Sequence, residues 1–289
     1  MELYVYGNTR QLVGVVESFE YLRWTRRYSQ CGSFELKAVA TPDNITLLVL
    51  GNLLWKSDDE EVGIIEHLEM NQADKEAITV SGRFTTSFLG RRIIWGTETL
   101  SGDLSACALK LINNHLITPS DTNRQIAGVA FASPALGVIV NTQVSYKNLM
   151  DTITGLCDAS DRGIKTVFDP STGTLTVALY VGAASQAVFS CEYENLTSQI
   201  YTQSAMDYAN AALIGGEGDG ASRVLASIAN SAGEARREVF VDAKDLRQAD
   251  FGAGYSTALL YRGQNRLSEL AITSGTLYLS SIRTYTSVG

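Results

Sequence analysis

Alternating apolar and polar positions mark the first hundred residues and predict β-strands. Apolar side chains recur at every second position in short runs, which is the period of a strand with one buried face. These runs cover residues 3–6, 12–16, 34–36, 63–70 and 77–80. The polar stretch 71–76 is predicted to join the last two runs as a hairpin. The pattern indicates a small, mostly antiparallel β-domain.

The apolar period lengthens in the middle of the chain and predicts two helices. One helical face, after a start signal that ends at Asp103, carries Leu104, Ala108, Leu111, Ile112 and His115. A second apolar stripe predicts a helix over 146–159. Two β-rich runs follow, 164–168 and 174–181, joined by the turn-forming sequence Asp-Pro-Ser-Thr-Gly. Helices followed by a hairpin predict an α+β segment.

The last third of the chain returns to β-type patterns. Its apolar runs cover 195–202, 209–214, 223–228 and 237–241. A final helix is predicted over 256–270, and a terminal β stretch begins at Thr276. We therefore expect an α+β, mainly β protein in which two β-rich regions flank an α+β insert. The expected domains are 1–96, 97–188 and 189–289.

Composition and charge limit the classes of partner. The 289 residues carry 23 Lys and Arg against 31 Asp and Glu, a net charge of −8. This balance gives no overall attraction to nucleic acid or to an anionic membrane. The apolar runs are far shorter than the ~20 residues that cross a bilayer, and the polar N-terminus lacks a signal-peptide core, so no integral membrane segment is expected. The four cysteines and two histidines lack metal-ligand spacing, which predicts reduced thiols and neither a zinc module nor a disulfide scaffold.

Three features of the sequence could carry chemistry, but each has a plainer interpretation. The acidic run 58–61 lacks the spacing of a calcium loop, which favours a solvated turn. The glycine-rich run 215–220 contains two acids and no following Lys-Ser/Thr, which favours a flexible strand connection over a phosphate cradle. His67 and His115 have no nucleophile motif beside them, so structural roles are favoured. We expect no catalytic residue, no metal site and no cofactor.

Paired arginines near aromatic residues are the remaining signal. The arginine pairs and their aromatic neighbours are Arg26–Arg27 with Trp24 and Tyr28, Arg91–Arg92 with Trp95, and Arg236–Arg237. A guanidinium group combines a rigid hydrogen-bonding fork with the ability to stack, so these residues could grip carboxylates across a subunit interface or line a DNA passage. A solvated strand edge protected by charge is the plainer alternative. The residues alone leave these alternatives open.

Segments spread along the chain resemble one protein family. In order, they are Trp24-Thr25-Arg26-Arg27-Tyr28, GSFEL at 32–36, GNLLW at 51–55, VSGRF at 80–84, LGRRIIWG at 89–96, YKNL at 146–149, the glycine-rich run at 215–220 and RREVFVDA at 236–243. These colinear segments resemble the tail-hub proteins of siphophages and of prophages of Gram-positive bacteria. Such coverage is far more specific than any single motif.

The resemblance implies a structural protein, not an enzyme, in which two β-barrel-like tail-hub domains flank the α+β insert. Hubs of this kind assemble as trimers, so we expect a homotrimer at the distal tip of the virion tail, assembled in the cytoplasm of the bacterial host. Its implied partners are the distal tail protein, the end of the tape-measure protein and the tip or receptor-binding proteins. The hub would adapt the tail tube to these components and gate DNA ejection, with transient DNA passage and no stable nucleic-acid binding.

This interpretation also suggests which residues lie at subunit interfaces. The candidates are Trp24, Arg26, Arg27, Arg91, Arg92, Trp95, Arg236 and Arg237. The alternative functions are a carbohydrate-binding adhesin and a tail-tip module associated with a cell-wall hydrolase. An adhesin would expose aromatic side chains in a groove, whereas a hydrolase would need a cluster of acid, base or metal-binding groups.

Overall fold

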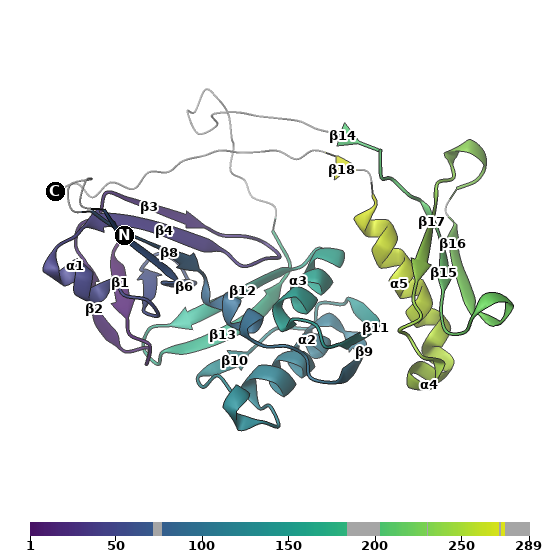
Figure 1. Cartoon of the computed structure of the whole chain (residues 1–289), viewed down its shortest axis with the longest axis horizontal. Coiled ribbons are helices and arrows are strands. Elements are labelled where there is room, and N and C mark those ends of the chain that lie inside the picture. Colours follow the sequence, from purple (N-terminus) through teal and green to yellow (C-terminus); the bar gives the residue numbers. More distant parts are fainter. Residues whose placement is uncertain (72–76, 184–202, 230, 272, 275–289) are drawn as a thin grey trace.

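The computed structural model describes residues 1–71, 77–183, 203–229, 231–271 and 273–274. The molecule is elongated: a β-rich region built from the first part of the chain lies at one end, and a sheet with helix α5 lies at the other (Figure 1). Helices and further strands lie between them. The predicted mainly β architecture with helices is confirmed. The predicted β stretches at 195–202 and after Thr276 lie outside the described residues.

Eight strands of the first β region form two antiparallel sheets. The first sheet contains, in ladder order, β2 (Leu12–Val16), β1 (Leu3–Tyr6), β5 (Leu53–Lys56) and β6 (Val62–Ile64). The second contains β3 (Tyr21–Thr25), β4 (Ser33–Val39), β8 (Ala77–Arg83) and β7 (His67–Asn71). Apolar side chains from both sheets meet in one buried cluster. The predicted strands are confirmed, with 63–70 divided between β6 and β7, whereas β3, β5 and the short helix α1 (Pro42–Leu47) were not predicted.

The two sheets are joined at one side and open at the other. Only Ile65 and Glu66 separate β6 from β7, and the Glu66 N–H donates to the Ser81 carbonyl (3.0 Å) where the chain crosses between sheets. Gly82 lies beside this crossing, since a Cβ added there would be 1.8 Å from the Ile64 carbonyl oxygen. Within the described residues, β2 and β3 have no strand partner on their outer edges. The predicted barrel closure is therefore not observed in this region.

The middle of the chain contains two small sheets and two main helices. One sheet pairs β9 (Thr97–Asp103) with β11 (Ile139–Ser145), and the other has the order β10 (Val129–Phe131), β13 (Thr174–Tyr180) and β12 (Gly163–Asp169). The helical elements are η1 (Thr85–Arg91), α2 (Leu104–Ile112), its π-helical continuation η2 (Asn113–Ile117), η3 (Thr122–Arg124) and α3 (Leu149–Ala159). Both predicted helices and the predicted hairpin are confirmed, whereas β9, β10 and β11 were not predicted.

Side-chain caps set the start of both main helices. The Asp103 carboxylate accepts a hydrogen bond from the Ser105 N–H (2.9 Å), and the Asn148 side-chain oxygen accepts one from the Met150 N–H (2.9 Å). Each cap satisfies a backbone donor that has no partner inside its helix. Helix α3 consequently begins at Leu149, three residues later than the apolar stripe predicted.

A shared apolar cluster joins the first β region to the β12–β13 hairpin. The rings of Tyr6 and Phe168 meet edge to face with their centroids 4.9 Å apart. The buried hydroxyls of Thr86, in η1, and Thr166, in β12, hydrogen-bond at 2.8 Å. The predicted domain limit at 96/97 stays a prediction, and the limit at 188/189 lies outside the described residues.

The C-terminal part is a three-stranded sheet covered on one face by a helix. The sheet order is β16 (Leu225–Ala229), β15 (Ala211–Gly215) and β17 (Glu238–Asp242), and the covering helix is α5 (Tyr255–Glu269). The smaller elements are β14 (Gln203–Ser204), η5 (Gly220–Ser222), η6 (Gly233–Ala235), α4 (Gln248–Phe251), η7 (Gly252–Gly254) and β18 (Thr273–Ser274). The Gln143 side chain, on β11, donates to the Asp250 carboxylate (2.8 Å) and links this part to the middle segment. The predicted final helix is confirmed as α5.

Candidate functional site

Trp24 and Arg26 belong to a polar network within the chain, in which the Arg26 side chain is 48% exposed. The Trp24 indole N–H donates to Asp59 Oδ2 (3.1 Å), and Arg26 pairs with Glu60 (2.9 Å) and Glu61 (3.3 Å). Lys165 on β12 also pairs with Glu60 (2.8 Å), so the network spans the junction between the first β region and the middle segment. The contacts shown by Trp24 and Arg26 are therefore internal.

The acidic run is only partly the solvated turn that the sequence predicts. Asp58 is exposed and pairs with Lys56, but Glu61 is buried, with 4% of its surface exposed. Burial raises the pKa of Glu61 to about 7, while the positive charge of Arg26 acts in the opposite direction. The solvated-turn interpretation is wrong for Glu61, because the last residue of the run packs against β12 through an isolated bridge with Val167.

Arg27 points to a different environment from Arg26. It is exposed and lines a groove of about 440 Å³ together with Cys31 and Arg83 from the first β region and Met150 and other residues of α3. Arg83 is held by two hydrogen bonds to Glu66 (both 2.8 Å). Arg27 has no ion-pair partner in the described part of the chain, so its charge is available to a partner.

The second candidate group brings Arg92 and Trp95 together with Arg124, which was not predicted. The Arg92 Nε–H donates to the Arg124 carbonyl (2.6 Å), and the Arg124 guanidinium lies 4.0 Å from the centre of the Trp95 ring. Arg91 lies over the ring of Phe88 at 4.2 Å. This group combines exposed aromatic surface with several positive charges. No local pattern pointed to Arg124, since 29 residues separate it from Trp95 in the sequence.

The third pair stabilises the C-terminal part. Arg236 pairs with Glu238 two residues later (2.6 Å), and both side chains are exposed. Arg237 donates to the Ala205 carbonyl (2.7 Å), and its backbone N–H donates to the Asn210 side-chain oxygen (2.9 Å). The eight predicted interface residues thus fall into separate places, and they do not form one site.

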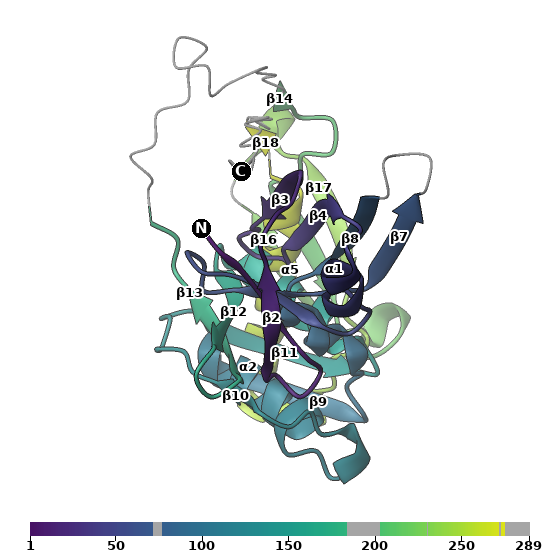
Figure 2. The same cartoon turned by 90° about the vertical axis from the view of Figure 1, so that its left-hand side faces the viewer.

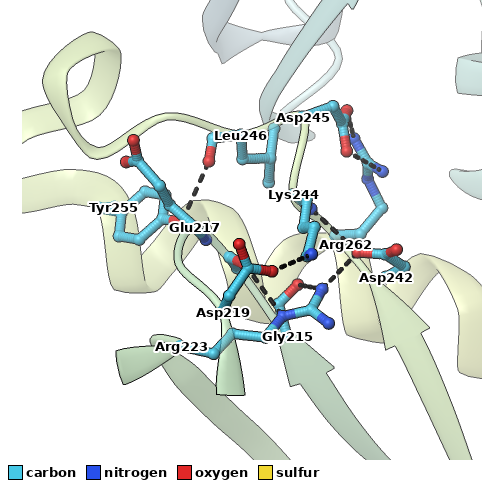
Figure 3. A network of polar contacts seen from close by, with 11 residues as sticks. Gly215, Glu217, Asp219, Arg223, Asp242, Lys244, Asp245, Leu246, Tyr255 and Arg262 are labelled. Carbon is cyan, nitrogen blue, oxygen red and sulfur yellow. Dashed lines mark hydrogen bonds and ion pairs between the residues drawn. The ribbon is translucent and has the colours of Figure 1, made fainter. Parts of the chain in front are cut away.

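The glycine-rich run forms the start of an ordered polar network (Figure 3). Arg223 donates to the carbonyls of Gly216 (3.1 Å) and Gly215 (2.7 Å) and pairs with Asp242. The Glu217 N–H donates to the Tyr255 hydroxyl (2.7 Å), which in turn donates to the Leu246 carbonyl (3.0 Å). The predicted flexible connection is therefore wrong in this respect: the run is fixed to α5 and to β17. Sequence reasoning missed Arg223, whose signal is an arginine placed just after a glycine-rich turn.

Arg223→Met should destabilise the C-terminal sheet by about 2 kcal/mol, because two carbonyls and a carboxylate lose a charged donor at a side chain that is only 16% exposed. The matched control is Arg236→Met, whose pair with Glu238 is exposed and should contribute about 0–1 kcal/mol. Urea denaturation, monitored by amide hydrogen exchange in β15 and β17, measures the difference in unfolding free energy between the two variants. Equal losses of unfolding free energy in the two variants would contradict the stabilising role of Arg223.

The remaining candidate residues occupy structural positions. His115 is buried with its Nε2 3.4 Å from a Glu98 carboxylate oxygen, and burial lowers its pKa. Cys107 and Cys157 are buried free thiols, and burial raises the pKa of Cys157 to about 12. Among the described residues, no three His, Cys, Asp or Glu side chains gather as a metal site. No helix in the same part of the chain is both long and apolar enough to span a membrane.

The solved structures that share the fold include three tail proteins. They are prophage tail protein gp18 from Listeria monocytogenes EGD-e (TM-score 0.55, 12% identity, 84% of this chain and 72% of that chain), the tail protein from Neisseria meningitidis MC58 (0.54, 16%, 96% and 78%) and the 43 kDa tail protein of prophage MuSo2 from Shewanella oneidensis (0.54, 13%, 93% and 79%). At these identities the likeness shows the fold alone. No curated protein sequence is significantly similar to this chain.

Family membership follows from the sequence profile. The profile of the family described as Siphovirus ReqiPepy6 Gp37-like protein matches residues 2–276. This match covers nearly the whole chain, and the solved structures of similar fold are tail proteins, so the predicted resemblance to phage tail proteins is confirmed. The chain therefore belongs to the family of Siphovirus ReqiPepy6 Gp37-like proteins.

Proposed function

We propose that this protein is the hub at the distal tip of a phage tail, where three copies adapt the tail tube to the tip components. The observation that carries the proposal is the fold shared with three tail proteins over 84%, 96% and 93% of this chain. A structural role in a tail follows from the family and from these neighbours. The tip position, the threefold ring and the gating of DNA ejection are the parts that we propose.

The open side of the first β region supports assembly through sheet edges. Strands β2 and β3 each present an unpaired outer edge within the described residues. Exposed edges of this kind pair readily with another chain, and closed cyclic symmetry limits such pairing to a defined number of copies. We therefore propose that neighbouring subunits cover these edges in the assembled tip, together with the distal tail protein and the end of the tape-measure protein.

The charge of the chain supports a passage that DNA crosses without binding. The net charge is −8 per chain, so a ring of copies would carry a large excess of negative charge. Each phosphate contact strengthens DNA binding, and a channel poor in available positive charge would therefore let DNA move through it. In this proposal the protein acts by its assembly geometry and carries out no catalysis.

Electron cryomicroscopy of intact tails tests the position and the copy number. We expect density for three copies of this chain at the distal tip, between the last ring of the tail tube and the tip proteins. The matched control is tails from a phage in which this gene is deleted from the genome and the protein is supplied from a second copy of the gene. One copy or six copies at the tip, or copies along the tube, would contradict the proposal.

A further inference from the structure

An irregular pair of backbone segments lies at one end of the β9–β11 ladder. Ile93 forms an antiparallel bridge with Asn148, and the regular ladder begins only a few residues further along both segments. Between the bridge and the ladder, Gly96 and Tyr146 both have positive φ, +82° and +52°. This backbone is strained for tyrosine. The strained residue, Tyr146, lies opposite Trp95 in the two paired segments.

The side chains at this irregular pair are largely exposed. The exposed fractions are 47% for Ile93, 52% for Trp95 and 73% for Tyr146. The Arg124 guanidinium stacks on the Trp95 ring at 4.0 Å and also donates to the Ile93 carbonyl (2.5 Å), so its position is fixed. Large apolar and aromatic groups grouped on a surface are typical of an interaction site.

Arg124 stacks on Trp95, and further cations adjoin these exposed side chains in the sequence. Arg91, Arg92, Arg124 and Lys147 have no carboxylate within ion-pair distance among the residues that the structure describes. Asp121 attracts Arg124, but its carboxylate already accepts two hydrogen bonds from Asn123 (both 3.0 Å). The name arginine–tryptophan face is used below for Ile93, Trp95, Tyr146, Arg92 and Arg124, together with Arg91 and Lys147, which adjoin them in the sequence.

A groove of complementary character lies between β2 and α1. It has a volume of about 510 Å³, and its apolar lining includes Val13 and Val15, which are 51% and 39% exposed, and Leu47. Gly14 permits the close approach of α1, because a Cβ at this position would lie 2.6 Å from Leu47 Cδ2. Two acidic residues complete the lining of this β2–α1 groove.

These two acids, Glu17 and Asp43, are exposed and have no cationic partner in the described part of the chain. The bare face of the C-terminal sheet also exposes apolar groups, Leu213 and Phe240 among them. Its acids are already neutralised, however, since Asp242 pairs with Arg223 and Glu238 with Arg236. The β2–α1 groove is therefore the better match for the unpaired cations of the arginine–tryptophan face.

We propose that the β2–α1 groove of one copy of this chain binds the arginine–tryptophan face of a second copy. The proposal rests on the proposed function, because it names the surfaces through which the copies of the hub meet. Strand β2 and helix α1 lie at the end of the molecule that faces the viewer in Figure 2, whereas β9 and β11 lie towards α5 in Figure 1. Two different surfaces at separate places make a head-to-tail contact, which produces a ring when the rotation closes. Apolar groups would fill the groove, and opposite charges would set the register.

Charge reversal tests the contact on the full-length chain. The face variant carries Arg91→Glu and Lys147→Glu, and the groove variant carries Glu17→Arg and Asp43→Arg. Sedimentation velocity, over protein concentrations up to the solubility limit, should show self-association weakened at least about tenfold in each variant. A chain with all four changes restores opposite charges and should associate as the wild type does. The control variant, Arg247→Glu with Arg266→Glu, makes the same charge change as the face variant at exposed residues of the C-terminal part and should leave association unchanged.

Several outcomes would overturn the proposal. These are a wild-type chain that stays monomeric up to its solubility limit, face and groove variants that associate normally, and a fourfold variant that stays dissociated. If the face variant instead loses retention of duplex DNA while associating normally, the face is a nucleic-acid surface and the proposal is wrong. Rings that form through other residues would contradict the proposed contact but would not contradict the proposed hub function. Tails that lack the chain at their tip would remove the hub proposal whether or not rings form in solution.

Discussion

Gly82→Ala is expected to unfold the first β region under conditions in which the wild-type protein is folded. The Cβ of alanine would lie 1.8 Å from the carbonyl oxygen of Ile64 and 3.1 Å from the backbone nitrogen of Glu66. Both obstacles are backbone atoms at the crossing between the two sheets, so no side-chain rotation can relieve the clash. We expect a loss of about 3 to 5 kcal/mol in the free energy of unfolding, which is a large share of the total stability of a domain.

Gly155→Ala is the matched control for this prediction. Gly155 lies inside α3 on an exposed face, and a Cβ there meets no atom within 4 Å. Alanine should therefore stabilise α3 by about 0.5–1 kcal/mol through its higher helix propensity. Urea denaturation monitored by the fluorescence of Trp24 and Trp55 reports on the first β region. A Gly82→Ala chain that unfolds at the urea concentration of the wild type would show that the sheets do not depend on this crossing.

The outcome for individual elements shows what local pattern can predict. Strands β1 and β2 match their predicted apolar runs, which the turn residues Gly7 and Asn8 separate. Strand β5, Leu53–Lys56, is buried along most of its length, and a short run without alternation cannot be assigned from its period. Helix α1 has a clear signal, the Thr41 cap with a proline after it, but it lasts only six residues and merges into an apolar run. The seven-residue strands β9 and β11 were also missed, although burial alternates along β11, so neither the length nor the one-sidedness of an element decides whether the local sequence predicts it.

For the candidate interface residues, the sequence indicated the residue types but not their tertiary contacts. The sequence pointed to Arg26 and Trp95 by residue type, but their partners lie 34 and 29 residues away, at Glu60 and Arg124. Which arginine is paired internally and which remains available depends on how the chain crosses between regions. No spacing rule encodes that choice, because the contacts join segments that meet only in the folded protein. The separation of Arg26 from its neighbour Arg27 is therefore information that only the structure contains.

Glu61→Gln is expected to change how stability depends on pH. The folded-state pKa of Glu61 is about 7, above its usual value of 4.5, chiefly because the carboxyl group is buried. Between these two values the folded chain binds more protons than the unfolded chain. The contribution of Glu61 is therefore fully present below pH 4.5 and is lost as the pH rises through 7. Glutamine stays neutral, so the variant should lack this loss.

The expected stability difference between Glu61→Gln and the wild type is large enough to measure. A shift of this size corresponds to a free energy on the order of 2 to 3 kcal/mol, so Glu61→Gln should gain that much relative to the wild type between pH 4.5 and pH 8. The neighbouring carboxylate is the matched control, because hydrogen bonds and charges from Lys165 and Arg26 hold the pKa of Glu60 below its usual value despite partial burial. Glu60→Gln should therefore lose stability relative to the wild type as the pH rises through 4.5. Stability is measured by urea denaturation at each pH across this range. Wild-type and Glu61→Gln stabilities that change in parallel with pH would show that Glu61 has the same pKa in the folded and the unfolded chain, and would contradict the prediction.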